Sequence, residues 1–246
     1  MANAQLIDYT GKGREDEKNH AANILIFTKS TRLNMSAGLF KEIQNFSQEK
    51  RLEELAYMAS TIPSSWEFID VTFLLSDVTR ASAQQITRTR TGSYAMQSQR
   101  VVDMSKGAVR NPYSLDSQLY HDFERASKMS LDSYERFISN GSDKQSARGI
   151  LPMNINCNLV CKYNFRSFVE LMLARQSLRV QGEYADLATE MKESVIAAWS
   201  WSEVFFESRF DKGIAMLEKI AKEIQIETGT GNGWDIAKAI DLLRKA

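Results

Sequence analysis

The chain has 246 residues, of which 43% are hydrophobic and 25% are charged, as in an ordinary soluble globular protein. Its 31 Lys and Arg residues balance 31 Asp and Glu residues, and a formal net charge of zero argues against a protein that mainly coats nucleic acid or an anionic membrane. The only two histidines, His20 and His121, stand in segments typical of a surface and exclude a multi-histidine metal site within one chain.

The sequence gives no indication of a membrane or secretory segment. Residues 1–19 are polar with mixed charge and lack the apolar stretch of a secretory signal. No apolar run approaches the length that spans a bilayer. We therefore expect a cytoplasmic protein without a membrane partner.

The first third of the chain predicts helices and then a strand. Residues 23–28 fit either a strand or the buried turn of a helix, because six residues are too few for periodicity to decide. Residues 36–60 carry apolar residues at helical spacing and predict one or two amphipathic helices that end near Pro63. Residues 68–75 are rich in β-branched and aromatic residues, which indicates a strand.

Two further helices are predicted in the middle of the chain. Ser76 and Asp77 offer an N-cap for a helix over 78–90, which Gly92 then breaks. Residues 114–138 predict a long helix that ends at Asn140-Gly141. The candidate buried positions of this helix are its large apolar and aromatic residues, Leu119, Tyr120, Phe123, Met129, Leu131, Tyr134 and Phe137.

Every odd-numbered residue from 155 to 163 is apolar, and this alternation predicts a strand. The two cysteines, Cys157 and Cys161, lie four residues apart in it, which separates their Cα atoms by about 13 Å. Because a disulfide requires less than roughly 7 Å between Cα atoms, we expect reduced thiols in the core, in agreement with a reducing compartment.

The rest of the chain is predicted to be helical, over residues 165–178, 184–206, 213–226 and 235–244. A glycine-rich string at 228–233 lacks the Lys-Ser/Thr of a phosphate-binding loop, and a connection between two helices with Asp235 as N-cap is favoured. The predicted fold class is α+β: a single domain over 1–246, with several long helices packed on an antiparallel sheet and a helix-rich C-terminal half.

The segment from Arg80 to Val102 holds four arginines and no acidic residue. Guanidinium groups among small polar side chains suit a phosphate, because they bind its oxygens in a bidentate manner. A solvated basic surface, or arginines paired with carboxylates elsewhere in the fold, explains the same composition. Since Arg88 and Arg90 lie about 200° apart on a helix, both can point into one pocket only where a helix ends.

Within this segment, Arg88-Thr89-Arg90 is followed after seven residues by Ser98, and then by Arg100. This string resembles the signature of the flavin-dependent thymidylate synthases, Arg-His-Arg, seven residues, Ser. Further blocks at matching separations extend the resemblance over about 63–191. They are 78–81 with Gln85, 147–152, 164–167, Arg175 and 181–183.

The resemblance implies a homotetramer with sites at subunit interfaces and no nucleic-acid partner. It implies that dUMP is methylated at C5 to dTMP, with a methylene group from methylenetetrahydrofolate, hydride from reduced FAD and NADPH as the reductant. The resemblance implies no metal-binding site. A chain that methylates or hydroxymethylates another pyrimidine deoxynucleotide, such as dCMP, and a noncatalytic nucleotide-binding paralogue are the alternatives. Nucleic-acid binding through the arginines is a fourth interpretation.

The resemblance also assigns roles to individual residues. Arg175 would be catalytic, since a guanidinium stays protonated and can stabilise the uracil as its N3 anion. The nucleotide site would comprise Gln85, Arg88, Gln97, Ser98, Arg100, Arg148 and Arg175, with Ser98, Arg100 and Arg148 on the phosphate. The FAD site would comprise Ser64, Arg88, Thr89, Arg90, Met96, Asn164, Arg166 and Glu170.

Surface ion pairs within one helix, Arg166 with Glu170 and Arg179 with Glu183, are the simpler interpretation of some of these charges. The chain also departs from the family at several positions. Thr89 stands in place of the central histidine, Met96 in place of an acidic residue, Ile62 in place of an upstream histidine and Glu170 in place of an asparagine. These departures point to altered flavin handling or altered base chemistry.

Overall fold

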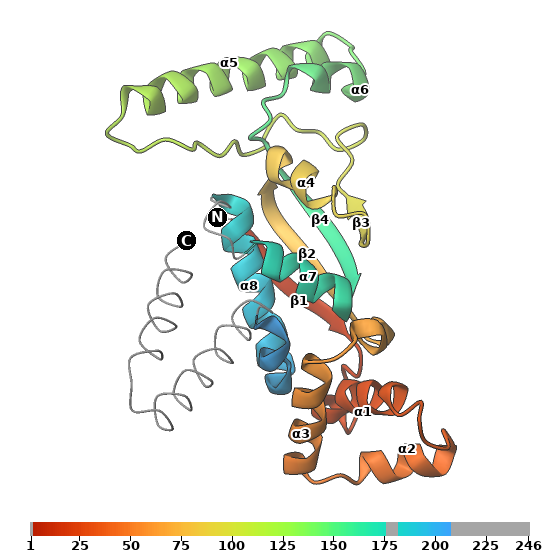
Figure 1. Ribbon diagram of the computed structural model, residues 1–246. Coiled ribbons are helices and arrows are strands. Elements are labelled where there is room, and N and C mark those ends of the chain that lie inside the picture. The colour runs from red at the N-terminus through yellow and green to blue at the C-terminus, as the bar shows by residue number, and fades with distance from the viewer. Residues whose placement is uncertain (1, 176–181, 208–246) are drawn as a thin grey trace, which may run out of the picture. The chain divides into compact units, whose positions relative to one another are not determined.

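The computed structural model describes residues 2–175 and 182–207, and the account below concerns the compact unit Met1–Ser202 (Figure 1). The described residues form one antiparallel four-stranded sheet in the order β1-β2-β4-β3. The strands are β1 (Asn3–Tyr9), β2 (Asp70–Thr79), β3 (Ser93–Met96) and β4 (Asn156–Asn164). Helices pack on this sheet, which confirms the predicted α+β class.

The two central strands, β2 and β4, form the core of the sheet. Their register pairs Val71 with Tyr163 and Phe73 with Cys161, and all four side chains are buried. Every odd-numbered residue from Ile155 to Tyr163 is buried, as the alternation predicts. Both cysteines are free and buried, and burial raises the pKa of the Cys161 thiol to about 12.

The prediction of a helix over 78–90 is wrong at both ends. β2 continues to Thr79, because Val78 and Thr79 pair with Cys157 and Asn156 of β4 beyond an irregularity in the ladder. The helix α4 therefore spans only Arg80–Ile86, and the Thr79 side chain caps it by accepting a hydrogen bond from the Ser82 N–H. Pairing with β4 outweighs the local capping signal.

A short strand, β3, replaces the predicted end of that helix. The chain turns after α4 and pairs Ser93 with Lys162 at the far end of β4. At the turn, a Cβ on Gly92 would lie 2.5 Å from both the Tyr163 ring and the Tyr94 hydroxyl, so only glycine fits there without displacing β3.

The N-terminal helices resolve the ambiguity at residues 23–28. These residues belong to α1 (Glu17–Lys29), whose buried residues recur at helical spacing. α2 (Ala37–Gln44) and α3 (Gln48–Ala59) follow, so residues 36–60 form two helices, and η1 (Pro63–Phe68), a 3₁₀ helix, leads into β2. The strand β1 was not predicted; it mixes polar and apolar residues in one short segment and pairs only at the edge of the sheet.

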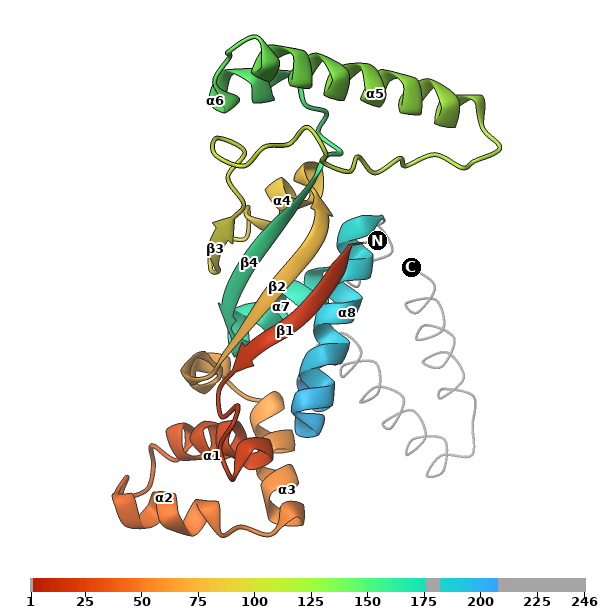
Figure 2. The ribbon, with the colours of Figure 1, turned by 180° about the vertical axis from the view of Figure 1, so that it is seen from behind.

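Helices α7 (Phe165–Arg175) and α8 (Glu183–Ala198) cover the sheet, and α8 lies along β1 in both views (Figures 1 and 2). Phe168 of α7 stacks on Phe73 of β2 with ring centroids 5.5 Å apart. α8 ends before a 3₁₀ helix, η3 (Ser200–Phe206), so the predicted helix over 184–206 is one helix and one 3₁₀ segment. Residues 176–178, the glycine-rich string and the two predicted last helices lie outside the described residues.

The long helix is confirmed as α5 (Gln118–Ser139), with Asn140 as its C-cap and Gly141 at φ 87°. Of its seven predicted buried positions, one is buried, three are half-buried and three are exposed. Tyr134 is buried, whereas Leu119, Met129 and Phe137 are 55%, 65% and 46% exposed. The reason is that α5 packs on α6 (Lys144–Ala147) and η2 (Arg148–Ile150) instead of on the sheet.

Phe73→Ala should lower the free energy of unfolding by about 3 to 5 kcal/mol, because it opens a cavity beneath Phe168. Urea denaturation followed by circular dichroism measures the change. Leu52→Ala at a half-exposed position of α3 is the control and should stay within about 0.5 kcal/mol of the parent. Equal losses in the two variants would contradict the assignment of the core to the β2–α7 contact.

Candidate functional site

The segment that carries the arginine motif lies between α4 and β3. Since Ser93 pairs with Lys162, the preceding turn, 87–92, stands at the Asn164 end of β4. The Tyr94 hydroxyl donates a hydrogen bond of 2.6 Å to the Thr89 carbonyl, which fixes the turn against the strand. The motif thus sits where a helix ends, as two arginines with a common target require.

None of the four arginines of this segment pairs with a carboxylate among the described residues. Arg88 and Arg90 are exposed, and their side chains make no hydrogen bond or ion pair within that part of the chain. Arg80 contacts the Met96 sulfur at 3.2 Å, and Arg100 donates to the Gln145 amide oxygen at 2.7 Å. Within the part of the chain that the structure describes, no carboxylate neutralises these arginines, which leaves their charges open to an anion there.

A second cationic cluster forms at the other end of β3. The Arg100–Gln145 hydrogen bond and a 2.8 Å bond from Lys144 Nζ to the Val101 carbonyl tie this loop to α6. Arg148 follows α6 directly, and its side chain has no partner among the described residues. The structure therefore brings the Ser98–Arg100 loop close to α6, which Arg148 follows directly.

The strand β3 separates the two clusters by about 13 Å, the length of four strand residues. Gln97 extends the ladder beyond β3: its N–H donates to the Asn158 carbonyl at 2.9 Å, and its side-chain oxygen accepts from the Asn158 N–H at 3.1 Å. Gln97 therefore has a structural task in addition to its predicted contact with a nucleotide. Gln85 is exposed at the end of α4.

The residues predicted on the flavin side are partly engaged with one another. Asn164 accepts a 2.8 Å hydrogen bond from the Ser167 N–H at the start of α7. Arg166 forms ion pairs with Glu67 at 2.7 Å and Glu170 at 3.0 Å. The simpler interpretation of Arg166 and Glu170 as a surface pair thus holds in this structure, and an anionic ligand at Arg166 would have to compete with two carboxylates.

Ser64 lies in a different place, in a cleft between α1, α3 and η1. This cleft also holds Ile62, and Lys29, Arg32 and Tyr57 supply two cations and an aromatic ring. The neighbouring Ser65 hydroxyl is buried without a hydrogen-bond partner among the described residues. Such donors suit an anionic ligand with a planar ring.

Arg175 lies at the end of α7 against Tyr184 in the first turn of α8. The guanidinium carbon is 4.5 Å from the centroid of the Tyr184 ring. Burial raises the pKa of Tyr184, and the nearby Thr89 and Arg175 side chains partly offset this effect. The predicted catalytic arginine therefore stands close to the middle residue of the arginine motif.

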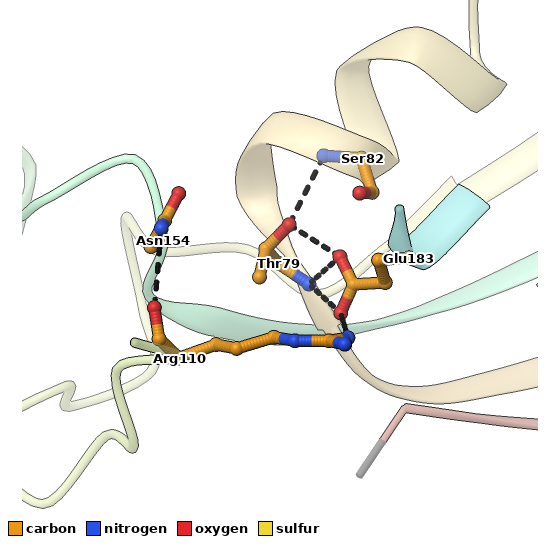
Figure 3. Close-up of polar contacts among 5 residues, drawn as sticks. All are labelled: Thr79, Ser82, Arg110, Asn154 and Glu183. Carbon is orange, nitrogen blue, oxygen red and sulfur yellow. Dashed lines mark hydrogen bonds and ion pairs between the residues drawn. The ribbon is translucent and has the colours of Figure 1, made fainter. Parts of the chain in front are cut away.

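Glu183 carries a role that the sequence did not reveal (Figure 3). Its carboxylate is 8% exposed and accepts from the Thr79 N–H at 3.2 Å, from the Thr79 hydroxyl at 2.5 Å and from Arg110 Nη1 at 2.7 Å. Asn154 donates to the Arg110 carbonyl at 3.1 Å. Arg179, the partner that helical spacing suggested, lies outside the described residues.

This network fixes the start of α8 to the start of α4. Gly182 precedes Glu183 at φ 86°, a conformation that favours glycine, so the adjacent Gln181-Gly182-Glu183 block is the one signal by which the sequence marked this point. Because α4 delivers the arginine motif, Glu183 positions that motif without facing a ligand. Burial alone raises the pKa of Glu183, but the Ser82, Thr79 and Arg110 side chains outweigh burial and hold it below its usual 4.5.

In the part of the chain that the structure describes, neither histidine belongs to a metal-binding cluster. His20 lies 3.2 Å from the Asp16 carboxylate on α1, and His121 is exposed on α5. Within the described residues, no group of three His, Cys, Asp or Glu side chains is arranged to hold a metal ion. The described helices include none whose length and apolar character would allow it to cross a membrane.

Comparison with known proteins gives a consistent result. The model of the family described as thymidylate synthase complementing protein matches residues 5–199. The flavin-dependent thymidylate synthase of Geobacter sulfurreducens is 30% identical over 129 residues, 51% of this chain and 56% of that protein. Those of Pyrococcus furiosus and Pyrococcus abyssi are each 26% identical, over 63% and 52% of this chain and 66% and 55% of their own length. The chain thus spans about half to two thirds of these relatives.

Glu183→Gln should lower the free energy of unfolding by about 2 kcal/mol at pH 7, because it removes a buried charge that accepts several hydrogen bonds. A lowered carboxyl pKa stabilises the fold above the pKa of the unfolded chain, and this stability is lost as the pH falls through the lower, folded value. The gap between parent and variant should therefore shrink below about pH 4.5.

Urea unfolding at pH 7 and at pH 3 measures both free energies. Glu170→Gln removes an exposed ion pair and is the control, with a change of at most about 1 kcal/mol. A gap for Glu183→Gln that is the same at both pH values would show that its carboxylate is not the stabilising species.

Proposed function

The chain belongs to the thymidylate synthase complementing protein family, and on that premise we propose that it methylates dUMP at C5 to give dTMP. The methylene group comes from methylenetetrahydrofolate, and NADPH keeps the FAD cofactor reduced. The observation that supports this proposal is the set of arginines without a carboxylate partner among the described residues, at both ends of β3 and at the end of α7. They suit a substrate and a cofactor that both carry phosphate.

In this proposal the cluster at the C-terminal end of β3 holds the phosphate of the nucleotide. Arg148 and Arg100 supply guanidinium forks, and Ser98 supplies a hydroxyl. Gln85, Arg88 and Gln97 line the remainder of the nucleotide site. The Arg100–Gln145 bond would hold one fork in place before the ligand arrives, which reduces the ordering that binding requires.

Arg175 acts on the base. Its guanidinium stays protonated and stabilises the pyrimidine as an anion at N3, which makes C5 nucleophilic without a covalent bond to the protein. The state of the cysteines supports this route. Both are buried, and burial raises the pKa of both thiols, so neither offers a thiolate to attack the ring.

The residues at the N-terminal end of β3 fit an FAD in part. Arg88 and Arg90 would hold its diphosphate and Thr89 would contact it, while the cleft that contains Ser64 offers cations and an aromatic ring. Asn164, Met96, Arg166 and Glu170 complete this proposed site, although Arg166 already has two carboxylate partners. The bound flavin would supply the hydride that reduces the transferred methylene group to methyl.

The exposed apolar side chains of α5 support a homotetramer whose sites lie at subunit interfaces. Leu119, Met129 and Phe137 are solvent-exposed along one helix in a single chain, a surface that association would bury. The free, buried cysteines agree with a cytoplasmic location. We extend the proposal to one catalytic domain over 1–246, with no nucleic-acid or membrane partner.

The departures at Thr89, Met96, Ile62 and Glu170 favour a second candidate. Each changes a polar group on the flavin or folate side, whereas Ser98, Arg100 and Arg148 on the phosphate side are retained. A divergent enzyme that methylates or hydroxymethylates another pyrimidine deoxynucleotide, such as dCMP, would have this pattern.

The purified protein should be yellow or take up added FAD, and it should release tritium from C5 of dUMP only when methylenetetrahydrofolate and NADPH are present. The assay is run in parallel on C5-tritiated dCMP, and faster release from dCMP would favour the second candidate. A colourless protein that binds dUMP but takes up no FAD would refute both enzymes and leave a nucleotide-binding paralogue.

Arg148→Ala should weaken dUMP binding about tenfold or more, because it removes a charge-assisted contact to the phosphate. Isothermal titration calorimetry measures the dissociation constants for dUMP and for deoxyuridine, which lacks the phosphate. Arg136→Ala on α5, whose guanidinium contacts only Ser133 among the described residues, is the matched control and should bind like the parent. An equal loss for deoxyuridine would contradict a role at the phosphate.

A further inference from the structure

The surroundings of Arg175 differ from those of Arg110 and Arg166. Arg110 and Arg166 each contact carboxylates, Glu183 in the first case and Glu67 and Glu170 in the second. Arg175 has no carboxylate partner among the described residues, and its Nε atom is buried without a hydrogen bond in that part of the chain. In that part of the chain, the face of the Tyr184 ring lies 4.5 Å from the guanidinium carbon.

The Tyr184 ring is a fixed surface. It is 3% exposed in the first turn of α8, next to Glu183, whose buried carboxylate ties that turn to Thr79 and Arg110. The Tyr184 hydroxyl is buried and finds no hydrogen-bond partner among the described residues. The ring face lies 4.5 Å from the Arg175 guanidinium carbon, and the hydroxyl lies near the Thr89 and Arg175 side chains.

An aromatic ring and a carboxylate hold a guanidinium with different consequences. A carboxylate neutralises the cation and occupies its N–H donors. A ring face attracts the cation through its quadrupole and leaves the donors at the edge of the guanidinium plane free. An arginine that must stabilise a developing anion requires the second arrangement, because a neutralised cation would contribute little to a transition state.

We propose that Tyr184 is a positioning residue for Arg175, orienting its guanidinium plane by stacking while leaving its charge and its donors to the anionic edge of a pyrimidine ring. This inference rests on the proposed function. It assigns to the chain a pairing between the end of α7 and the start of α8 that fixes the cation beside Thr89 of the arginine motif.

The test compares full-length variants in the C5 tritium-release assay. Tyr184→Leu should lower kcat about tenfold and change KM for dUMP little, because the cation loses its orientation while the phosphate contacts remain. Tyr184→Phe keeps the ring face and should restore kcat to within about twofold of the parent. Tyr113→Leu, which removes a ring that packs on Phe123 and contacts no arginine among the described residues, is the control and should leave kcat unchanged.

Arg175→Ala distinguishes a failure of the proposed function from a failure of the positioning role of Tyr184. If it leaves turnover intact, the role of Arg175 in the proposed function is wrong. If it abolishes turnover while Tyr184→Leu retains the parental kcat, the positioning role is wrong. A Tyr184→Phe variant as impaired as Tyr184→Leu would also overturn it, since the hydroxyl would then be the active group.

A second readout does not depend on activity. Urea unfolding of Arg175→Ala, Tyr184→Leu and the double variant forms a thermodynamic cycle. Stacking predicts that the double variant loses less stability than the sum of the two single losses. Additive losses would show that the side chains do not interact and would overturn the inference, whatever the substrate of the protein.

Discussion

The buried carboxylate of Glu183 is the constraint on which the arrangement of the site depends. It accepts hydrogen bonds from Thr79, which ends β2 and caps α4, and from Arg110. The start of α8 is thereby joined to two segments that are far from it in sequence. A buried carboxylate is unfavourable unless its oxygens are satisfied, and here Thr79 and Arg110 satisfy both. The start of α8 therefore has one position relative to α4. The arginine motif and Tyr184 receive their places from that single junction.

A division of charge follows from this arrangement. Arg110 and Arg166 contact carboxylates, while the arginines at the ends of β3 and α7 have no carboxylate partner among the described residues. A net charge of zero conceals this division, because the average is taken over both kinds. The free cations are stable in their exposed or ring-stacked positions without a ligand, since water or an aromatic face takes the place of a counter-ion. The protein thus keeps positive potential where an anionic ligand would arrive.

The sequence predicted those parts of the fold whose signals are local. Nine alternating residues specified β4, and Asn140-Gly141 specified the end of α5, because both patterns are complete within one segment. The limits of α4 were not predictable in this way, since Val78 is held in β2 by Cys157 of another strand. The exposure of Leu119 and Met129 was missed for a related reason. An amphipathic pattern indicates that a helix has an apolar face, and it does not say whether that face packs within the chain.

At the site, too, features within one segment were predictable from the sequence and contacts between distant segments were not. A spaced motif was enough to select Arg88, Arg90 and Arg100 as candidates. The carboxylate partners of Arg166 were only half foreseen, because Glu170 is four residues away and Glu67 is 99. The contact between Thr79 and Glu183 spans 104 residues and has no signature in either segment. A sequence motif can identify residues that would bind a ligand. The residues that orient them come from distant segments and are identified only in the folded structure.

The short strand β3 and the close packing at Gly92 fix the distance between the two cationic clusters. The distance between the two cationic clusters is set by backbone pairing with β4, so side-chain substitutions in the strand leave it unchanged. An added or deleted residue acts differently, because a shift of one position turns every following side chain to the opposite face of the sheet. Substitutions within β3 therefore leave the distance between the two clusters, and so the length of ligand that spans them, unchanged. A change in the number of residues in β3 would alter that distance. The distance between the clusters is thus set by backbone pairing and does not depend on which side chains occupy β3.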